Sequence, residues 1–158
     1  MRRLIVCVAL LFIVTQIPFA AVKTDTWTGW LTVSCCKDSP IKPPPQHPRQ
    51  CLISCASGGS EVMISIEKGR FLTLDPKGKT IALDALKAST IERGTAATIT
   101  GTLEGNVIKV DTLTLLSHES LSSKMQKEMA DAKVSMEKAQ KEQDAKEAAK
   151  KAADKIKK

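Results

Sequence analysis

The sequence predicts a mainly β fold, in which five short strands close into a small barrel in the order strand, strand, strand, helix, strand, strand. Three observations predict it. Apolar and polar residues alternate in separate short stretches between residues 26 and 116. One stretch rich in Ala and Leu, without alternation, separates the third of these from the fourth. From Ser117 onward the composition changes to Ala, Lys and Glu, which adds a helical tail.

Residues 1–22 have the features of a signal peptide. Two arginines precede an uninterrupted apolar run at residues 4–14, and the small residues Ala20 and Ala21 offer a cleavage site. An uncleaved anchor is the alternative, but spanning a bilayer takes about 20 mostly apolar residues, and polar residues interrupt this run. We therefore expect an exported protein, periplasmic or secreted, whose domain of residues 23–118 begins after cleavage.

The first predicted strand covers residues 26–34 and has two different faces. Trp27, Leu31 and Val33 share one parity, so they form an apolar face that we expect to enter the core. Trp30 lies on the opposite, Thr-rich face. This placement predicts that Trp30 is exposed and available for a surface contact.

Two further strands follow a long loop. Residues 60–67 alternate cleanly, and a turn at Lys68 and Gly69 leads into a third strand at residues 70–74. The sequence Asp-Pro-Lys-Gly at residues 75–78 has turn residues at turn spacing, so we expect the chain to reverse there. One or two helical turns are predicted at residues 84–88.

The last two strands form a predicted hairpin, residues 95–103 and 106–116, around the turn at Gly105. Gly101 interrupts the first of them, and a strand glycine usually marks a bulge or tight bend. In the second, the apolar parity switches near Asp111, which predicts a bulge there. This order of elements is that of an OB-like barrel, with a five-stranded sandwich as the alternative.

Residues 35–59 are predicted to be a long Pro-rich loop, and they hold the four cysteines that remain after signal cleavage: Cys35, Cys36, Cys51 and Cys55. In an oxidising compartment such cysteines are read first as disulfide candidates. The second interpretation is a Zn²⁺ or Cu(I) site made of Cys36, His47, Cys51 and Cys55. A third, redox chemistry, fits poorly because the spacing is C-x₃-C rather than C-x-x-C. Since His47 stands between prolines, we expect it to be solvated.

The cysteine pattern resembles that of a family of small exported bacterial proteins with an uncharacterised OB-like domain. The match runs over residues 26–116, from Ser34-Cys35-Cys36 through Cys51-x₃-Cys55 to Gly58-Gly59 and the later strands. The resemblance implies an exported OB-like domain and no known activity. The family pattern has three cysteines, which correspond to Cys36, Cys51 and Cys55, and this chain has Lys37 where a glycine often follows.

Cys35 is thus the additional cysteine. If the first strand continues through Ser34, the neighbouring Cys35 and Cys36 point to opposite faces. We therefore expect that they do not pair with each other and that a metal site leaves Cys35 out. We expect Cys36 to pair with either Cys51 or Cys55, and the remaining one of these two to be free or joined to Cys35.

The tail, residues 119–158, is predicted to be a charged helix with Ser120 as its N-cap. Met and Ala recur in it at spacings of four and three, which is only a thin apolar seam. We expect a solvated helix or frayed tail that can be removed from the domain. The alternatives are an oligomerisation arm or a weak contact with membranes or other anionic surfaces through its terminal lysines.

No catalytic constellation occurs in the chain, so we expect no enzyme. Residues 23–118 carry a net charge of only +2 and few aromatic residues, which argues against binding of nucleic acid. The expectation is a non-enzymatic OB-like binding or structural module of the cell envelope, whose ligand or protein partner is unknown and which needs no cofactor. The alternative is an envelope metal-binding protein with Zn or Cu.

Overall fold

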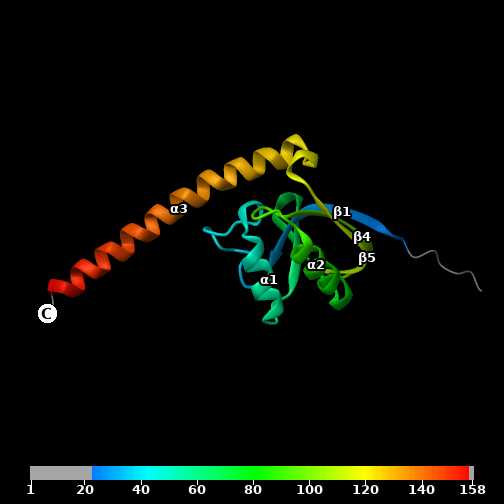
Figure 1. The fold of residues 1–158 in the computed structure, drawn as a ribbon, viewed down its shortest axis with the longest axis horizontal. Helices are drawn as coiled ribbons and strands as arrows, with labels where there is room; N and C mark the ends of the chain where they lie inside the picture. The colour runs from blue at the N-terminus through cyan, green and yellow to red at the C-terminus, as the bar shows by residue number, and fades with distance from the viewer. Residues whose placement is uncertain (1–22, 157–158) are drawn as a thin grey trace, which may run out of the picture.

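A computed structural model describes residues 23–156, so the predicted signal peptide lies outside the described residues (Figure 1). The strands are β1 (Asp25–Val33), β2 (Val62–Ile66), β3 (Arg70–Leu74), β4 (Ala96–Glu104) and β5 (Val107–Leu116). The helices are α1 (Arg49–Ser57), α2 (Pro76–Ala88) and α3 (Ser123–Ile156). Three single 3₁₀ turns complete the set: η1 (Pro44–Gln46), η2 (Glu67–Gly69) and η3 (His118–Ser120).

The five strands form one sheet in the order β1-β2-β3-β5-β4, and β4 pairs with β1 again, so that the sheet closes into a barrel. All pairs are antiparallel except β3 with β5. The predicted five strands, with a helix between the third and the fourth, are confirmed. The description as mainly β is wrong, because helical residues outnumber strand residues.

One bulge in the hairpin of β4 and β5 accounts for both irregularities predicted there. Thr100 is opposite Thr112 while Gly101 is opposite Val110, so Asp111 is the extra residue. A Cβ atom at position 101 would lie 2.1 Å from the carbonyl oxygen of Lys109. The strands can approach this closely at the bulge only because residue 101 is glycine.

Helix α2 is longer than predicted and includes the segment expected to be a turn. Asp75 is its N-cap: the Asp75 carboxylate accepts hydrogen bonds from Gly78 N at 2.9 Å and from Val110 N at 3.2 Å. Pro76 is the first helical residue, a position that proline favours. Asp and Pro are typical of turns and of helix starts alike, and here the buried residues Ala82 and Leu86 favour the helix.

Only one of the two tryptophans lies where it was predicted: Trp27 packs against the main core, but Trp30 is not exposed. Trp30 is only 3% exposed, whereas Trp27 is half-buried against the main core. The inner face of β1 does enter that core through Leu31 and Val33. The outer face is covered as well, because Trp30 packs with Ala96 and Leu121 in a second apolar cluster. The prediction that Trp30 offers a surface contact is therefore wrong.

The cover over Trp30 is the start of α3. Trp30 Nε1 donates a hydrogen bond to Glu128 Oε2 at 3.0 Å, and Gln46 Nε2 donates to the carbonyl oxygen of Met129 at 2.8 Å. Lys124 forms an ion pair with Glu67. The first turns of α3 are therefore part of the folded domain, which the composition break at Ser117 did not indicate.

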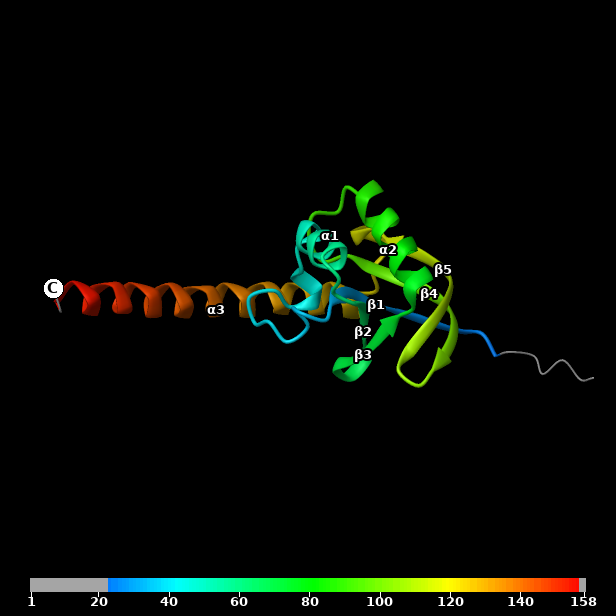
Figure 2. The ribbon, with the colours of Figure 1, turned by 90° about the horizontal axis from the view of Figure 1, so that it is seen from below.

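The rest of α3 extends beyond the barrel as a single helix (Figures 1 and 2). The residues at 141–150 are all exposed, in agreement with the predicted solvated helix. The N-cap is Ser122, whose hydroxyl accepts a hydrogen bond from Met125 N, rather than Ser120, which lies in η3. Among the described helices, none combines the length and the apolar character needed to cross a membrane.

Candidate metal centre

The segment predicted to be a loop, residues 35–59, contains α1. Pro48 is the N-cap of this helix, and Leu52 and Ala56 anchor one face of it in the main core. Cys51 and Cys55 are four residues apart, so they lie next to each other along the helix. The long loop was predicted because prolines dominate its first half; the second half is helical once Leu52 and Ala56 find a surface to pack on.

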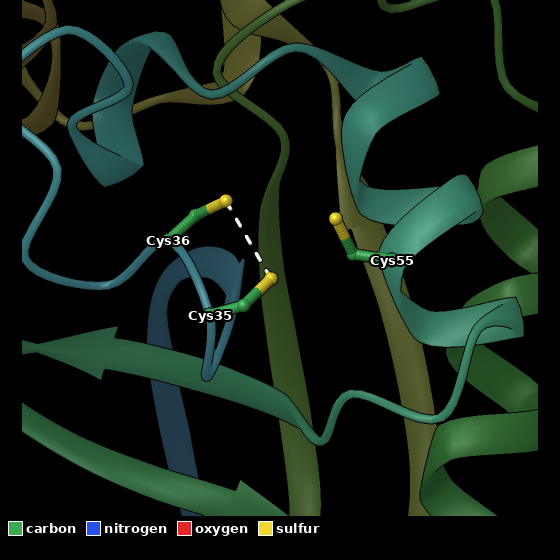
Figure 3. A group of neighbouring side chains, drawn as sticks. All are labelled: Cys35, Cys36 and Cys55. Atoms are coloured by element: carbon green, nitrogen blue, oxygen red, sulfur yellow. Dashed lines mark hydrogen bonds between the residues drawn. The ribbon is translucent and has the colours of Figure 1, made fainter.

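Cys35 and Cys36 are in a turn and not at the end of the strand. Strand β1 ends at Val33, and Cys36 N donates a hydrogen bond to the carbonyl oxygen of Val33 at 2.9 Å. The alternation of side chains stops there, and the two sulfurs lie 3.6 Å apart on the same side (Figure 3). The prediction that these cysteines point to opposite faces is wrong.

The four sulfurs form a chain of contacts. Cys36 Sγ is 4.0 Å from Cys51 Sγ, which in turn is 3.8 Å from Cys55 Sγ. A disulfide bond is about 2.05 Å long, so all four described cysteines are free thiols here. Tetrahedral zinc, with Zn–S bonds of about 2.3 Å, separates its ligand sulfurs by about 3.8 Å. The spacing of the thiols therefore matches the edge of a metal tetrahedron.

The ligand atoms fall into two triads that share one cysteine. The first triad is Cys35, Cys36 and Cys55; the second is Cys36, His47 and Cys51; within each, all the ligand atoms lie within 4.8 Å of one another. The structure thus brings together the four residues of the predicted metal site and adds Cys35. Figure 3 shows the side chains of the first triad, with Cys35 and Cys36 in the turn after β1 and Cys55 on α1.

His47 is completely buried, in contrast to the expected solvated histidine. Its main chain is fixed by a hydrogen bond from Gly94 N to the His47 carbonyl oxygen, 3.1 Å long. Its Nδ1 lies 3.2 Å from the carbonyl oxygen of Pro48, which can only accept a hydrogen bond, so Nδ1 carries the proton. Nε2 is buried and has no hydrogen-bond partner among the described residues.

This arrangement is the one that prepares a histidine for metal binding. A backbone carbonyl on one ring nitrogen fixes the tautomer and leaves the lone pair on the other. Burial also lowers the pKa of His47, so the imidazole is neutral at physiological pH. A buried polar atom without a partner costs free energy in the metal-free protein, and a metal ion would remove that cost.

The thiols differ in how readily they lose their protons. Burial raises the pKa of Cys36 to about 12. A hydrogen bond to Cys35, together with burial, raises the pKa of Cys55 to about 11. The Ser60 side chain, as a hydrogen-bond partner, lowers the pKa of the exposed Cys35. A bound metal must therefore displace protons from Cys36 and Cys55.

One positive charge lies beside the cluster. Lys42 Nζ donates a hydrogen bond to Cys51 Sγ at 3.6 Å, and the charge of that sulfur as a thiolate raises the pKa of Lys42. The ammonium group can offset the excess negative charge of a metal bound by several thiolates. The sequence held no signal for Lys42 or for Ser60, because neither residue is a soft-metal ligand and only the fold brings them to the thiols.

In a comparison with known proteins, no protein-family model, no curated protein and no solved structure matches the chain. A proposal for its function therefore rests on the geometry of the structure. The resemblance to small exported bacterial proteins therefore stays a prediction.

Proposed function

We propose that this protein is a non-enzymatic, OB-like metal-binding protein that holds one Zn²⁺ or Cu(I) ion through Cys36, His47, Cys51 and Cys55. The observation that carries the proposal is the buried His47 Nε2, which has no hydrogen-bond partner among the described residues. A nitrogen of the same ring lies within 4.8 Å of the Cys36 and Cys51 sulfurs. Five of the six distances within this ligand set are at or below 4.8 Å.

Several features support the OB-like assignment. The ring order β1-β2-β3-β5-β4, the parallel pairing of β3 with β5 and the helix between β3 and β4 are those of an OB barrel. The predicted export to the periplasm or the outside rests on residues 1–22 and is part of the proposal. Nucleic acid is not among the proposed partners.

Metal binding explains the geometry better than a structural disulfide does. A disulfide needs no histidine, whereas Cys₃His is a common ligand set of structural zinc sites. The ligands also come from three separate places in the chain: the turn after β1, the end of η1 and helix α1. A single ion would therefore fix the turn after β1 to η1 and α1, which follow each other directly in the chain.

The test is titration of the reduced, metal-free protein with Zn²⁺ against a colorimetric chelator, and with Co²⁺ as a spectroscopic probe. We expect one ion per chain, with the absorption bands of tetrahedral cobalt and of thiolate-to-cobalt charge transfer. His47→Gln should weaken binding by more than about tenfold, since even the loss of an outer partner of a metal ligand costs 10–100-fold.

His118→Gln is the matched control, because the hydrogen-bond partners of the His118 ring are the backbone carbonyl oxygens of Arg93 and Gly94 and none of the proposed ligands. It should leave the affinity unchanged. Equal effects of the two substitutions would contradict the assignment of His47. So would native protein whose intact mass shows two disulfides and no metal.

A further inference from the structure

We propose that the same cluster binds two Cu(I) ions, one in each triad, with the Cys36 thiolate as the ligand that bridges them. This inference rests on the proposed function and specifies its metal. The cluster offers five donors, one more than a tetrahedral Zn²⁺ ion uses. The surplus donor is Cys35, which the structure places beside Cys36 and Cys55.

The two triads suit three-coordinate ions. In the first, Cys35 and Cys36 have sulfurs 3.6 Å apart, and Cys55 completes the set within 4.8 Å. In the second, the Cys36 and Cys51 sulfurs are 4.0 Å apart, and His47 completes it. Cu(I) is a soft ion that thiolates select, it is stable with three ligands, and a thiolate sulfur has lone pairs enough for two ions.

Cys36 has the position that a bridging ligand requires. It is the buried cysteine of the four and the one member common to both triads. The Cys51 sulfur of the second triad also contacts the Cys55 sulfur of the first, at 3.8 Å, so the two triads are adjacent. Two ions bound in them would lie close together on either side of Cys36.

The charge of such a cluster is partly offset by a neighbouring lysine. Loading replaces the protons of up to four thiols, which pass to the buffer, and no electron is transferred because copper enters and stays as Cu(I). Four thiolates and two Cu(I) ions leave two negative charges, and the ammonium group of Lys42 lies 3.6 Å from the Cys51 sulfur. Since Cys35 is exposed, the ion in the first triad is open to exchange with thiols in solution.

The experiment is anaerobic titration of the reduced, metal-free full chain with Cu(I) buffered by a coloured chelator, read by native mass spectrometry. We expect two Cu(I) per monomer, but one Zn²⁺. Cys35→Ser should lower the copper capacity to one and leave the zinc capacity at one. His118→Gln should change neither capacity.

The two proposals fail in different ways. One Cu(I) and one Zn²⁺ per chain would overturn the dinuclear cluster and leave the single metal site standing. Binding of neither metal would overturn both. Two Cu(I) in Cys35→Ser would overturn the role of Cys35. X-ray absorption of the loaded wild-type protein gives a readout that needs no variant: a short copper–copper vector is expected, and its absence would exclude a bridge through Cys36.

Discussion

At the scale of single residues, His47 and Cys36 determine what the site can do. The Pro48 carbonyl oxygen holds the proton of His47 on Nδ1, so the buried Nε2 keeps a lone pair for a metal. The Cys36 thiol is buried at the centre of the cluster and keeps its proton to high pH. These two most buried donors are therefore neutral in the metal-free site, which makes their burial tolerable without an ion.

The raised thiol pKa values predict that the reduced, metal-free protein loses stability in alkali. The ordinary thiol pKa is 9.0, and the folded values are about 12 for Cys36 and about 11 for Cys55. Above pH 9 the unfolded chain releases these protons while the folded chain retains them. The stabilisation is thus complete below pH 9 and is lost as pH rises through the folded values.

Urea unfolding at about pH 8 and about pH 10.5 checks this, with a chelator and a reductant present. The midpoint of the wild type should fall, and the fall should be smaller in Cys36→Ala, which lacks the thiol with the larger shift. A Cys36→Ala variant as sensitive to pH as the wild type would contradict the prediction.

At the scale of elements, α3 has two parts with different roles. Its first turns cover the outer face of β1, where Trp30, Ala96 and Leu121 form a buried cluster with Met125 and Met129 packed against it. Its later turns are exposed and carry alternating charges. The apolar seam predicted from the sequence thus begins as a docking face on the barrel and continues into solvent.

Because the start of α3 covers the barrel and the rest is exposed, we expect shortening an apolar side chain to have different effects in the two parts. Leu121 is 5% exposed, whereas Val134 is 68% exposed. Leu121→Ala should lower the free energy of unfolding by about 2–5 kcal/mol, as leucine truncations in a packed site do. Val134→Ala, the matched control, should change it by less than about 0.5 kcal/mol.

The unfolding temperatures of two shortened chains test the same difference between the start and the rest of α3. A chain that ends at Gln140 should unfold within a few degrees of the full chain. A chain that ends at Leu116 uncovers Trp30 and should unfold at least about 10 °C lower, since about 1 kcal/mol shifts the midpoint of a small domain by 4–8 °C. Equal midpoints for the two shortened chains would mean that the contacts of α3 contribute nothing.

At the scale of the whole molecule, the proposed metal centre lies where the barrel has its longest connection. The chain leaves β1 at Val33 and re-enters the sheet at Val62, and all the ligands lie between these two points. A bound ion therefore closes this connection on itself and fixes α1 to the end of β1.

Metal removal is accordingly predicted to destabilise the whole domain. A ligand present at about 100 times its dissociation constant, bound only to the folded state, contributes about 2.7 kcal/mol. This corresponds to a midpoint higher by about 10 °C or more. Thermal unfolding of the reduced protein with Zn²⁺ and with a chelator measures the difference. Cys36→Ser, which removes the ligand common to both triads, should unfold at the same temperature in both conditions.

The sequence by itself determined much of the barrel. The alternating stretches predicted the five strands and their order, because a half-buried strand must alternate whatever it packs against. Gly101 and the parity switch at Asp111 predicted the bulge from both strands of the hairpin. Residue types also predicted the proposed ligand set Cys36, His47, Cys51 and Cys55, since soft metals select thiolate and imidazole, and the structure brings these residues together.

Only the tertiary structure decided what covers each face and where the alternation ends. Trp30 is buried because α3, nearly a hundred residues later in the chain, packs on the outer face of β1. Cys35 joins the cluster because β1 ends at Val33, and His47 is buried because residues far along the chain, such as Gly94, hold its loop. The local periodicity of a strand shows that it has two different faces, but long-range packing determines which of these faces is exposed to solvent.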